Sequence, residues 1–278
     1  MNQFQKQLER IQSQSLESKK SWYSQVAIAY DKTRPRYPSP LINEIINQTQ
    51  LEQNSSLLEI GCGPGIATTQ LAELGFSIVA IEPSAESASL AKEKCRNYSN
   101  VEIINTTFEE WNLEAEKFDA VVASTSFHWL DRNLATQKSA ATLKPNGFLI
   151  LLWNTPPQPS KKIYDSFLKQ IYKTYAPNLI GYEELSRYQQ HLDQFGKQLI
   201  ASGYFDNLST GQFIKELSYS IDDYIMLLST LSPYIRLEEK QRDNLLIALK
   251  ESLRHNVGNT LNTHYLSTFH LVQKNNCY

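Results

Sequence analysis

Short apolar runs that alternate with helical patterns dominate the chain between Leu57 and Trp153. Each run is four to six residues long and is bounded by Gly, Pro, Asn or acidic residues. The runs are Leu57–Ile60, Ile78–Ile81, Val101–Ile104, Ala120–Ala123 and Phe148–Trp153. Such short, continuous runs are typical of strands that are buried on both faces. Because helices separate them, we predict an α/β fold with a mainly parallel, doubly wound sheet.

Turn and capping residues fix the expected helix boundaries between these strands. Gly75 follows an apolar helical face and is a plausible C-terminal stop. Ser84 and Asp131 each precede a helical pattern and are good N-cap residues, because their side-chain oxygens can accept from free backbone N–H groups. The sequence therefore predicts helices that begin near residues 66, 85 and 132.

The pattern changes after Trp153. Pro156, Pro157 and Pro159 make the segment after the fifth strand rigid. Helical spacing then predicts helical insertions at about 160–205 and 220–256. A strand is expected near Phe213–Tyr219, and the alternation from Leu261 to Leu271 predicts an antiparallel edge strand. We therefore expect residues 41–278 to form one domain with helical insertions, preceded by a polar helical arm or lid over residues 1–40.

Charge and composition limit the classes of partner. The 278 residues carry a formal net charge of −2, whereas a protein that grips a nucleic-acid backbone usually has a basic surplus. Residues 1–37 are locally basic, with seven basic and three acidic side chains. The three cysteines lack metal-ligand spacing, and no apolar run approaches the roughly 20 residues of a membrane span. We expect a cytoplasmic protein without a metal, a nucleic-acid partner or a membrane partner.

A glycine-rich loop joins the first strand to the first helix of this region. It reads EIGCGPG from Glu59 to Gly65, and Glu82 ends the second strand. Glycines permit positive φ and let a ligand lie against bare backbone, while a carboxylate can accept from both hydroxyls of a ribose. Nicotinamide-cofactor folds would require a third glycine where this chain has Ile66. The pattern therefore favours a different adenosine ligand, and an ordinary structural turn is the alternative.

Four segments together resemble class I S-adenosylmethionine-dependent methyltransferases. EIGCGPG is similar to the first motif of that family, and Glu82 stands at the position of its ribose-binding acid. FDAVVASTSFHWLD (118–131) and LKPNGFLILLW (143–153) resemble the fourth-strand motif and the turn and strand that follow it. The upstream YDKTRPRYP (30–38) looks like the lead-in of a small-molecule subgroup similar to trans-aconitate methyltransferases. The resemblance implies a Rossmann-like, seven-stranded sheet.

The resemblance also implies S-adenosylmethionine as the cofactor and a set of residues that bind it. These residues are Glu59, Gly61, Gly63, Gly65, Glu82, Thr107, Phe108, Ser124, Tyr30 and Arg34. Thr107 stands where relatives commonly have an Asp that accepts from the adenine amino group, so its contact would lack charge. Phe108 is expected either to pack on adenine or to belong to the core.

Residues near the ends of the fourth and fifth strands are the candidates for the acceptor side of the site. His128 is predicted either to accept a proton from the nucleophile or to line the pocket without a chemical role. Trp129 and Arg36 are the candidate acceptor contacts, because an arginine can bind a carboxylate bidentately. If the arginines bind only the carboxylate of the cofactor, the acceptor is neutral; if they are solvated charges, they bind neither. Trp153, Tyr182 and Tyr234 could form an apolar wall or pack in the core.

These observations predict a methyltransferase of a small organic molecule, such as a carboxylate. The nucleophile could be oxygen, nitrogen or carbon, and a carboxylate nucleophile would need no general base. Two other classes are open: a non-catalytic module that binds the cofactor, and a methyltransferase of RNA or protein. Fold alone does not decide among them.

Overall fold

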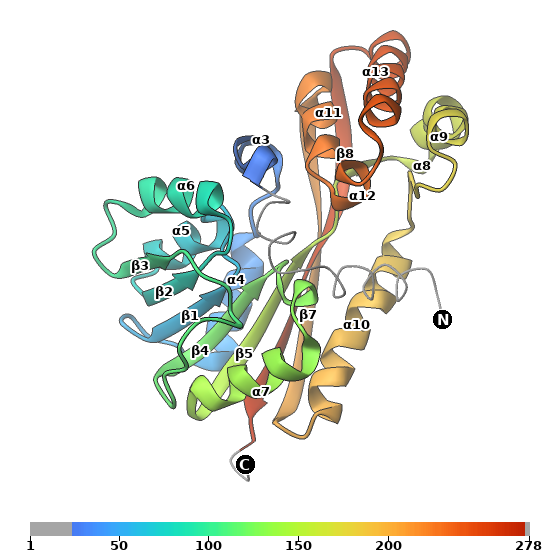
Figure 1. The fold of residues 1–278 in the computed structure, drawn as a ribbon. Coiled ribbons are helices and arrows are strands. Elements are labelled where there is room, and N and C mark those ends of the chain that lie inside the picture. The colour runs from blue at the N-terminus through green and yellow to red at the C-terminus, as the bar shows by residue number, and fades with distance from the viewer. Residues whose placement is uncertain (1–23, 276–278) are drawn as a thin grey trace.

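The computed structural model describes residues 24–275, and one mixed sheet forms its centre (Figure 1). The strand order is β3-β2-β1-β4-β5-β8-β6, and β7 pairs with β8. The strands are β1 (Ser56–Ile60), β2 (Ser77–Ile81), β3 (Val101–Ile104), β4 (Phe118–Ser124), β5 (Leu143–Asn154), β6 (Gln158–Pro159), β7 (Phe205–Ser220) and β8 (Thr260–Lys274). Strands β1 to β5 pair in parallel, which confirms the predicted doubly wound α/β sheet.

The last strand differs from the prediction, because β8 is not an edge strand. It pairs antiparallel with β5 and the two-residue β6 on one side and with β7 on the other. Two of the polar residues that made it look like an edge are buried and paired: Thr263 and Thr268 donate to the β7 carbonyls of Leu217 and Gly211 at 2.8 and 2.7 Å. With β6 counted, the sheet has eight strands rather than seven.

Helices cover both faces of the sheet and bury its apolar side chains. On one face lie α4 (Ser39–Thr49), α5 (Ile66–Glu73) and α6 (Ala85–Cys95). On the other face lie α7 (Arg132–Thr142) and α10 (Leu185–Ala201). The predicted caps are confirmed, because Ser84 accepts from the backbone N–H of Ser87 and Asp131 accepts from that of Leu134. Gly75 follows α5 with φ +85°, a conformation that favours glycine.

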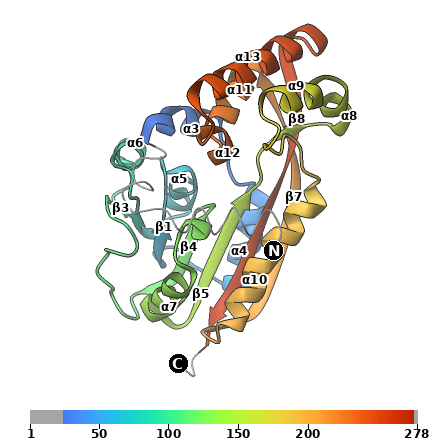
Figure 2. The same cartoon turned by 45° about the vertical axis from the view of Figure 1, so that its right-hand side comes forward.

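A separate helical cap stands beyond the carboxyl ends of the parallel strands, where the long β7–β8 ribbon reaches it (Figures 1 and 2). It contains α8 (Lys161–Ile163), the π-helical turn η3 (Tyr164–Leu168), α9 (Lys169–Tyr175), α11 (Ile221–Ser229), α12 (Ser232–Ile235) and α13 (Glu239–Asn256). These helices share their own apolar cluster, which includes Tyr172, Tyr234 and Leu249. The cap therefore has a core of its own.

The N-terminal segment joins the sheet layer to the cap. It contains η1 (Ser24–Val26) and α3 (Ala27–Thr33), whereas residues 1–23 of the predicted arm lie outside the described residues. Asp31 of α3 pairs with Lys94 of α6 at 2.6 Å, and Lys32 pairs with Asp223 of α11 at 2.7 Å. Helix α3 therefore bridges α6 and α11 above the sheet. Between residues 24 and 275, no helix is both long and apolar enough to cross a membrane.

Candidate active site

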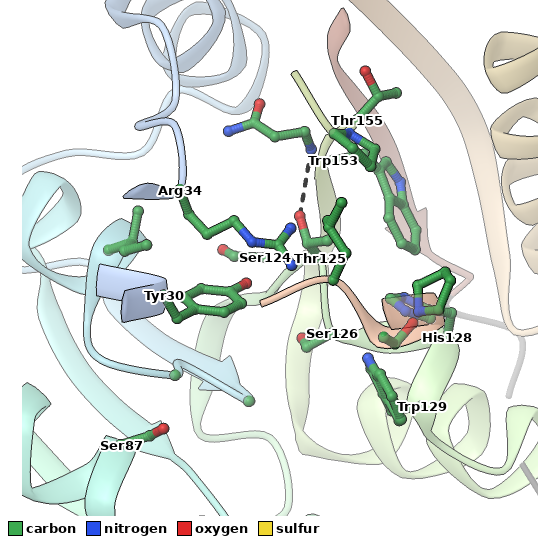
Figure 3. A pocket seen from close by; sticks show the side chains of 18 of the residues that line it. Tyr30, Arg34, Ser87, Ser124, Thr125, Ser126, His128, Trp129, Trp153 and Thr155 are labelled. Carbon is green, nitrogen blue, oxygen red and sulfur yellow. Dashed lines mark hydrogen bonds between the residues drawn. The ribbon is translucent and has the colours of Figure 1, made fainter. Parts of the chain in front are cut away.

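A cavity of about 610 Å³ lies between the carboxyl ends of the parallel strands and the helical cap. The strand side supplies the glycine loop after β1, Glu82 after β2, Ser124–Leu130 after β4 and Asn154 at the end of β5. The segment before α4 supplies Tyr30 and Arg34, and the cap supplies Leu231, Ser232, Pro233, Arg236 and Leu237. Figure 3 shows Tyr30 and Arg34 facing His128 and Trp129 across this space. The cavity therefore has a roof as well as a floor.

The glycine loop presents bare backbone to the cavity. Gly61 and Gly63 have φ values of +67° and +57°, which glycine adopts without strain. A β-carbon on Gly61 would lie 2.7 Å from Cβ of Ser126, whereas one on Gly63 would meet no atom within 4 Å. The space beside Gly63 is consequently open to a ligand, and Gly61 is fixed by the close approach of the segment after β4.

Glu82 holds the loop and faces the cavity. Its Oε2 accepts from the backbone N–H of Gly63, and its Oε1 accepts from that of Ser84, both at 2.8 Å. Each carboxylate oxygen has a second lone pair, so further acceptance is possible. Burial raises the pKa of Glu82 to about 7, although the two backbone hydrogen bonds oppose this shift. Ligand hydroxyls that donate to this carboxylate would replace the missing solvent, which fits a bound ribose.

Arg34 connects the N-terminal segment to the cap at the edge of the cavity. Its Nε donates to Thr230 Oγ1 and its Nη2 donates to the Thr230 carbonyl, both at 2.9 Å. The guanidinium carbon also lies 4.6 Å from the ring centroid of Tyr30. Arg34 therefore holds Tyr30 and the cap residue Thr230 together beside the cavity.

A chain of hydrogen bonds links Tyr37, Thr125 and Asn154. The hydroxyls of Tyr37 and Thr125 are 2.8 Å apart, and the Asn154 backbone N–H donates to Thr125 Oγ1 at 3.3 Å. Asn154 Nδ2 donates to the Pro35 carbonyl at 3.0 Å. Asn154 Oδ1 is buried and has no hydrogen-bond partner among the described residues. It is a free acceptor at the cavity wall.

His128 lies in a short 3-10 helix, η2 (Phe127–Trp129), that follows β4. Its ring centroid is 5.4 Å from Trp129 and 5.7 Å from Trp153. Nδ1 of His128 is buried without a hydrogen-bond partner in the described part of the chain. Burial, with a smaller contribution from the positive charge of Arg34, lowers the pKa of His128 to about 4. The imidazole is therefore neutral near pH 7.

Comparisons with known proteins agree with this geometry. Residues 58–151 match a family model described as a methyltransferase domain. An uncharacterized methyltransferase of Schizosaccharomyces pombe is 25% identical over 226 residues, which are 81% of this chain and 84% of that protein. The methyltransferase domain and this relative support an enzyme of the class I S-adenosylmethionine-dependent methyltransferase type, with S-adenosylmethionine as its cofactor.

Solved structures show the same fold. A protein from Anaeromyxobacter dehalogenans, provisionally named a type II methyltransferase, superposes with a TM-score of 0.63 at 18% identity. The superposition covers 86% of this chain and 97% of that one. Haemonchus contortus phosphoethanolamine N-methyltransferase 2, in complex with phosphomonomethylethanolamine and S-adenosylhomocysteine, gives 0.52 at 14% identity over 93% of this chain and 59% of that one.

Most of the predicted site residues of this methyltransferase line the cavity together. They are Tyr30, Arg34, Gly61, Gly63, Glu82, Thr107, Phe108, Ser124, His128 and Trp129. The Thr107 hydroxyl donates to Glu110 Oε2 at 3.0 Å and accepts from the Glu110 backbone N–H at 3.1 Å, so it is largely committed to a turn. Phe108 is 2% exposed and stacks on Trp111, so it is both a core residue and a cavity residue.

Three predicted residues do not reach the cavity. Glu59 is fully buried behind the loop, where its Oε2 accepts from the hydroxyl of Thr68 on α5 at 2.6 Å. Gly65 turns into α5 with φ +80° and lies against α6. Arg36 points away and pairs with Asp31 at 3.3 Å. The Glu59 carboxylate and the Gly65 turn hold the loop in shape, and Arg36 is not in reach of an acceptor in this cavity.

Several cavity residues were not predicted from the sequence. Asn154 could have been found, because it ends β5 as Ser124 ends β4. Leu192 and Phe195 of α10, together with Tyr188, had no such signal, since helical spacing does not say what a face packs against. Of the three aromatic residues considered for an apolar wall, Trp153 lines the cavity, whereas Tyr182 stacks on Tyr164 and Tyr234 lies in the cap core. Within residues 24–275, no cluster of His, Cys, Asp or Glu could hold a metal.

Proposed function

We propose that this enzyme methylates a small organic molecule that is enclosed in the roofed cavity. The observation that supports this most is that three segments line the cavity on the side opposite the strand ends: residues 30–37, the stretch 176–183 before α10, and 231–237 around α12. A partly covered cavity of about 610 Å³ suits a cofactor and a small acceptor. A folded protein or an RNA duplex would need an open surface instead. We infer that residues 24–40 act as part of the lid.

The residues around the glycine loop fit the cofactor. Bound S-adenosylmethionine supplies a methyl group on a sulfonium, which is reactive towards nucleophiles. We propose that the Glu82 carboxylate accepts from its ribose, that Gly63 provides the open space beside it, and that Phe108 packs against the adenine. We assign Arg34 and Tyr30 to the cofactor carboxylate because both line the cavity, and Ser124 lines the same cavity.

The chain contributes positioning and the exclusion of water more than proton transfer. A methyl transfer needs the nucleophile in line with the breaking bond, and an enclosed pocket supplies this alignment. With a pKa of about 4, His128 is a weak base, so it can orient a nucleophile through a hydrogen bond better than it can remove a proton near pH 7. An acceptor whose nucleophilic group needs no strong base fits such a site.

The position of Arg36 bears on the charge of the acceptor. A carboxylate acceptor held by Arg36 has lost its support, since Arg36 is paired with Asp31 outside the cavity. Arg34 is the arginine that residues 30–37 present to the cavity, and we assign it to the cofactor. The narrower likeness to trans-aconitate methyltransferases and a cytoplasmic location stay predictions.

The proposal is tested with the purified full-length enzyme and labelled S-adenosylmethionine. We expect calorimetry to show cofactor binding that Glu82→Gln weakens by about tenfold or more, because hydrogen bonds to a charged group are worth ~1.5–3 kcal/mol. Glu251→Gln on the exposed part of α13 is the matched control. Incubation with pooled metabolites, RNA and protein follows. Label found in RNA or protein, rather than in small molecules, would overturn the proposal, and so would an absence of cofactor binding.

A further inference from the structure

Four aromatic rings form a continuous row on the cavity wall that faces Tyr30 and Arg34. The ring centroids of Trp129 and His128 are 5.4 Å apart, those of His128 and Trp153 are 5.7 Å apart, and those of Trp153 and Phe195 are 4.8 Å apart. The four residues come from η2, β5 and α10, and all of them line the cavity. We call these four residues the ring row.

A buried histidine fixes the orientation of the ring row at its middle. Trp153 Nε1 donates to His270 Nδ1 at 3.1 Å, and His270 on β8 is 1% exposed. Because Nδ1 accepts, the proton of a neutral imidazole is on Nε2, which faces Asp193 Oδ1 of α10 at 3.9 Å. The Trp153 indole is consequently held from behind and cannot turn without leaving buried polar atoms unpaired.

Close packing of α10 fixes the end of the ring row. A β-carbon on Gly196 would lie 2.7 Å from Cδ2 of His270 and 2.9 Å from a methyl group of Leu208. Only a residue without a side chain lets α10 approach β8 this closely, and this approach places the neighbouring Phe195 against Trp153. The row is therefore built into the fold by β5, β8 and α10 together.

The rest of the cap side of the cavity is mostly apolar. Its aliphatic residues are Leu179, Ile180, Leu231 and Leu237, and Leu130 after η2 and Leu192 of α10 also line the cavity. The charged residues on this side are engaged: Arg236 donates to the Ser232 carbonyl at 3.1 Å, and Glu183 lies 3.5 Å from Nε of Arg187. An acceptor with a full charge would therefore displace existing contacts, whereas a neutral apolar body would not.

We propose that the acceptor carries a flat, uncharged aromatic ring system that lies against the ring row, and that His270 is a positioning residue for this subsite. The inference rests on the proposed small-molecule function. Aromatic rings prefer offset or edge-to-face contact with one another, and the tilts of 45°, 41° and 35° along the row present both faces and edges to a neighbouring ring. His128 Nδ1 and Asn154 Oδ1, which have no hydrogen-bond partner among residues 24–275, can orient its hydroxyl or amine.

Calorimetry on the full chain saturated with S-adenosylhomocysteine tests the inference with three probes. These are 2-naphthol, its saturated counterpart decahydro-2-naphthol, and the acyclic anion trans-aconitate. We expect 2-naphthol to bind about tenfold more tightly than decahydro-2-naphthol, the ratio that one or two aromatic contacts produce, and trans-aconitate to bind more weakly still. An equal or reversed order, or no binding of 2-naphthol, would overturn the inference.

Variants test whether the ring row causes the preference for 2-naphthol over decahydro-2-naphthol. Trp129→Leu should remove the preference for 2-naphthol and leave S-adenosylhomocysteine affinity unchanged, whereas Tyr175→Leu, an exposed aromatic outside the cavity, should change neither. His270→Leu should weaken 2-naphthol binding, and His270→Gln, which keeps an acceptor for Trp153, should restore it. If Gln fails where the protein is folded and binds S-adenosylhomocysteine, His270 does not position the row.

The two proposals fail in different ways. If the unmutated enzyme does not bind S-adenosylhomocysteine, or if it transfers methyl groups only to macromolecules, the proposed function is wrong. Intact S-adenosylhomocysteine binding together with a preference for decahydro-2-naphthol or trans-aconitate counts against the flat-ring acceptor alone.

Discussion

Arg34 and Thr230 are 196 positions apart in the chain, and two hydrogen bonds of 2.9 Å join them across the mouth of the cavity. One bond uses the Thr230 hydroxyl and the other uses its carbonyl, so the planar guanidinium is held at two points. Tyr219 adds a third tie, because its hydroxyl donates to the Thr33 carbonyl at 2.8 Å. The N-terminal segment is thus fastened to the cap, and a ligand beneath it is enclosed as long as this fastening holds.

We expect Arg34→Ala to weaken S-adenosylmethionine binding by about tenfold or more, because it removes hydrogen bonds from a charged donor worth ~1.5–3 kcal/mol. Arg34→Lys should rescue little, since an ammonium lacks the fork. Arg36→Ala is the matched control, because Arg36 lies two residues away and outside the cavity. Calorimetry checks all three variants. If Arg34→Ala and Arg36→Ala weaken S-adenosylmethionine binding equally, the net charge of the segment matters and the hydrogen bonds between Arg34 and Thr230 do not.

A substitution at Gly63 tests whether the space beside the glycine loop is needed for cofactor binding. A β-carbon there meets no protein atom, but it would point into the space that we assign to the cofactor. Gly63→Ala should therefore lower S-adenosylmethionine affinity by far more than it lowers the melting temperature. Gly258→Ala is the control for strain, because Gly258 also has a positive φ and open surroundings but lies off the cavity. The strain of a left-handed alanine is about 1–2 kcal/mol at either site. A parallel loss of stability and affinity at Gly63 would contradict the assignment.

Glu59 should contribute more to stability in mild acid than above neutrality. Burial raises the pKa of Glu59 to about 7, well above its ordinary value near 4.5, although the Thr68 hydroxyl opposes the shift. The folded state then binds more protons than the unfolded state between these two pH values, so this contribution to stability falls as pH rises from about 4.5 to about 7. Glu59→Gln mimics the protonated form. We expect it to raise the melting temperature at pH 8 and to change it little at pH 5, whereas Glu251→Gln should have no such pH dependence.

The sequence predicted the sheet better than the cap for a physical reason. Buried parallel strands such as Ile78–Ile81 can be found locally, because they are continuously apolar. The loop glycines can be found locally as well, because their positions need positive φ. The place of β8 between β5 and β7 depends on pairing with distant strands, and its buried threonines look like solvent-facing residues in sequence. Arg36 and Arg34 are likewise indistinguishable by pattern. Only the path of the chain after α3 sends one to Thr230 and the other to Asp31.

His128 should titrate far below the range in which the enzyme would use it as a base. Burial lowers its pKa to about 4, and the nearby charge of Arg34 adds to the shift. Its folded-state pKa is below the ordinary value of 6.5, so the stability that it contributes is present above pH 6.5 and is lost as pH falls towards 4. NMR titration of the five imidazoles, with His128→Gln to assign the resonance, measures this directly. We expect the His128 signal to stay constant between pH 5.5 and 8, and Arg34→Ala to shift its midpoint upwards. A midpoint between 6 and 7 would instead restore His128 as a general base for an acceptor that does not ionise by itself.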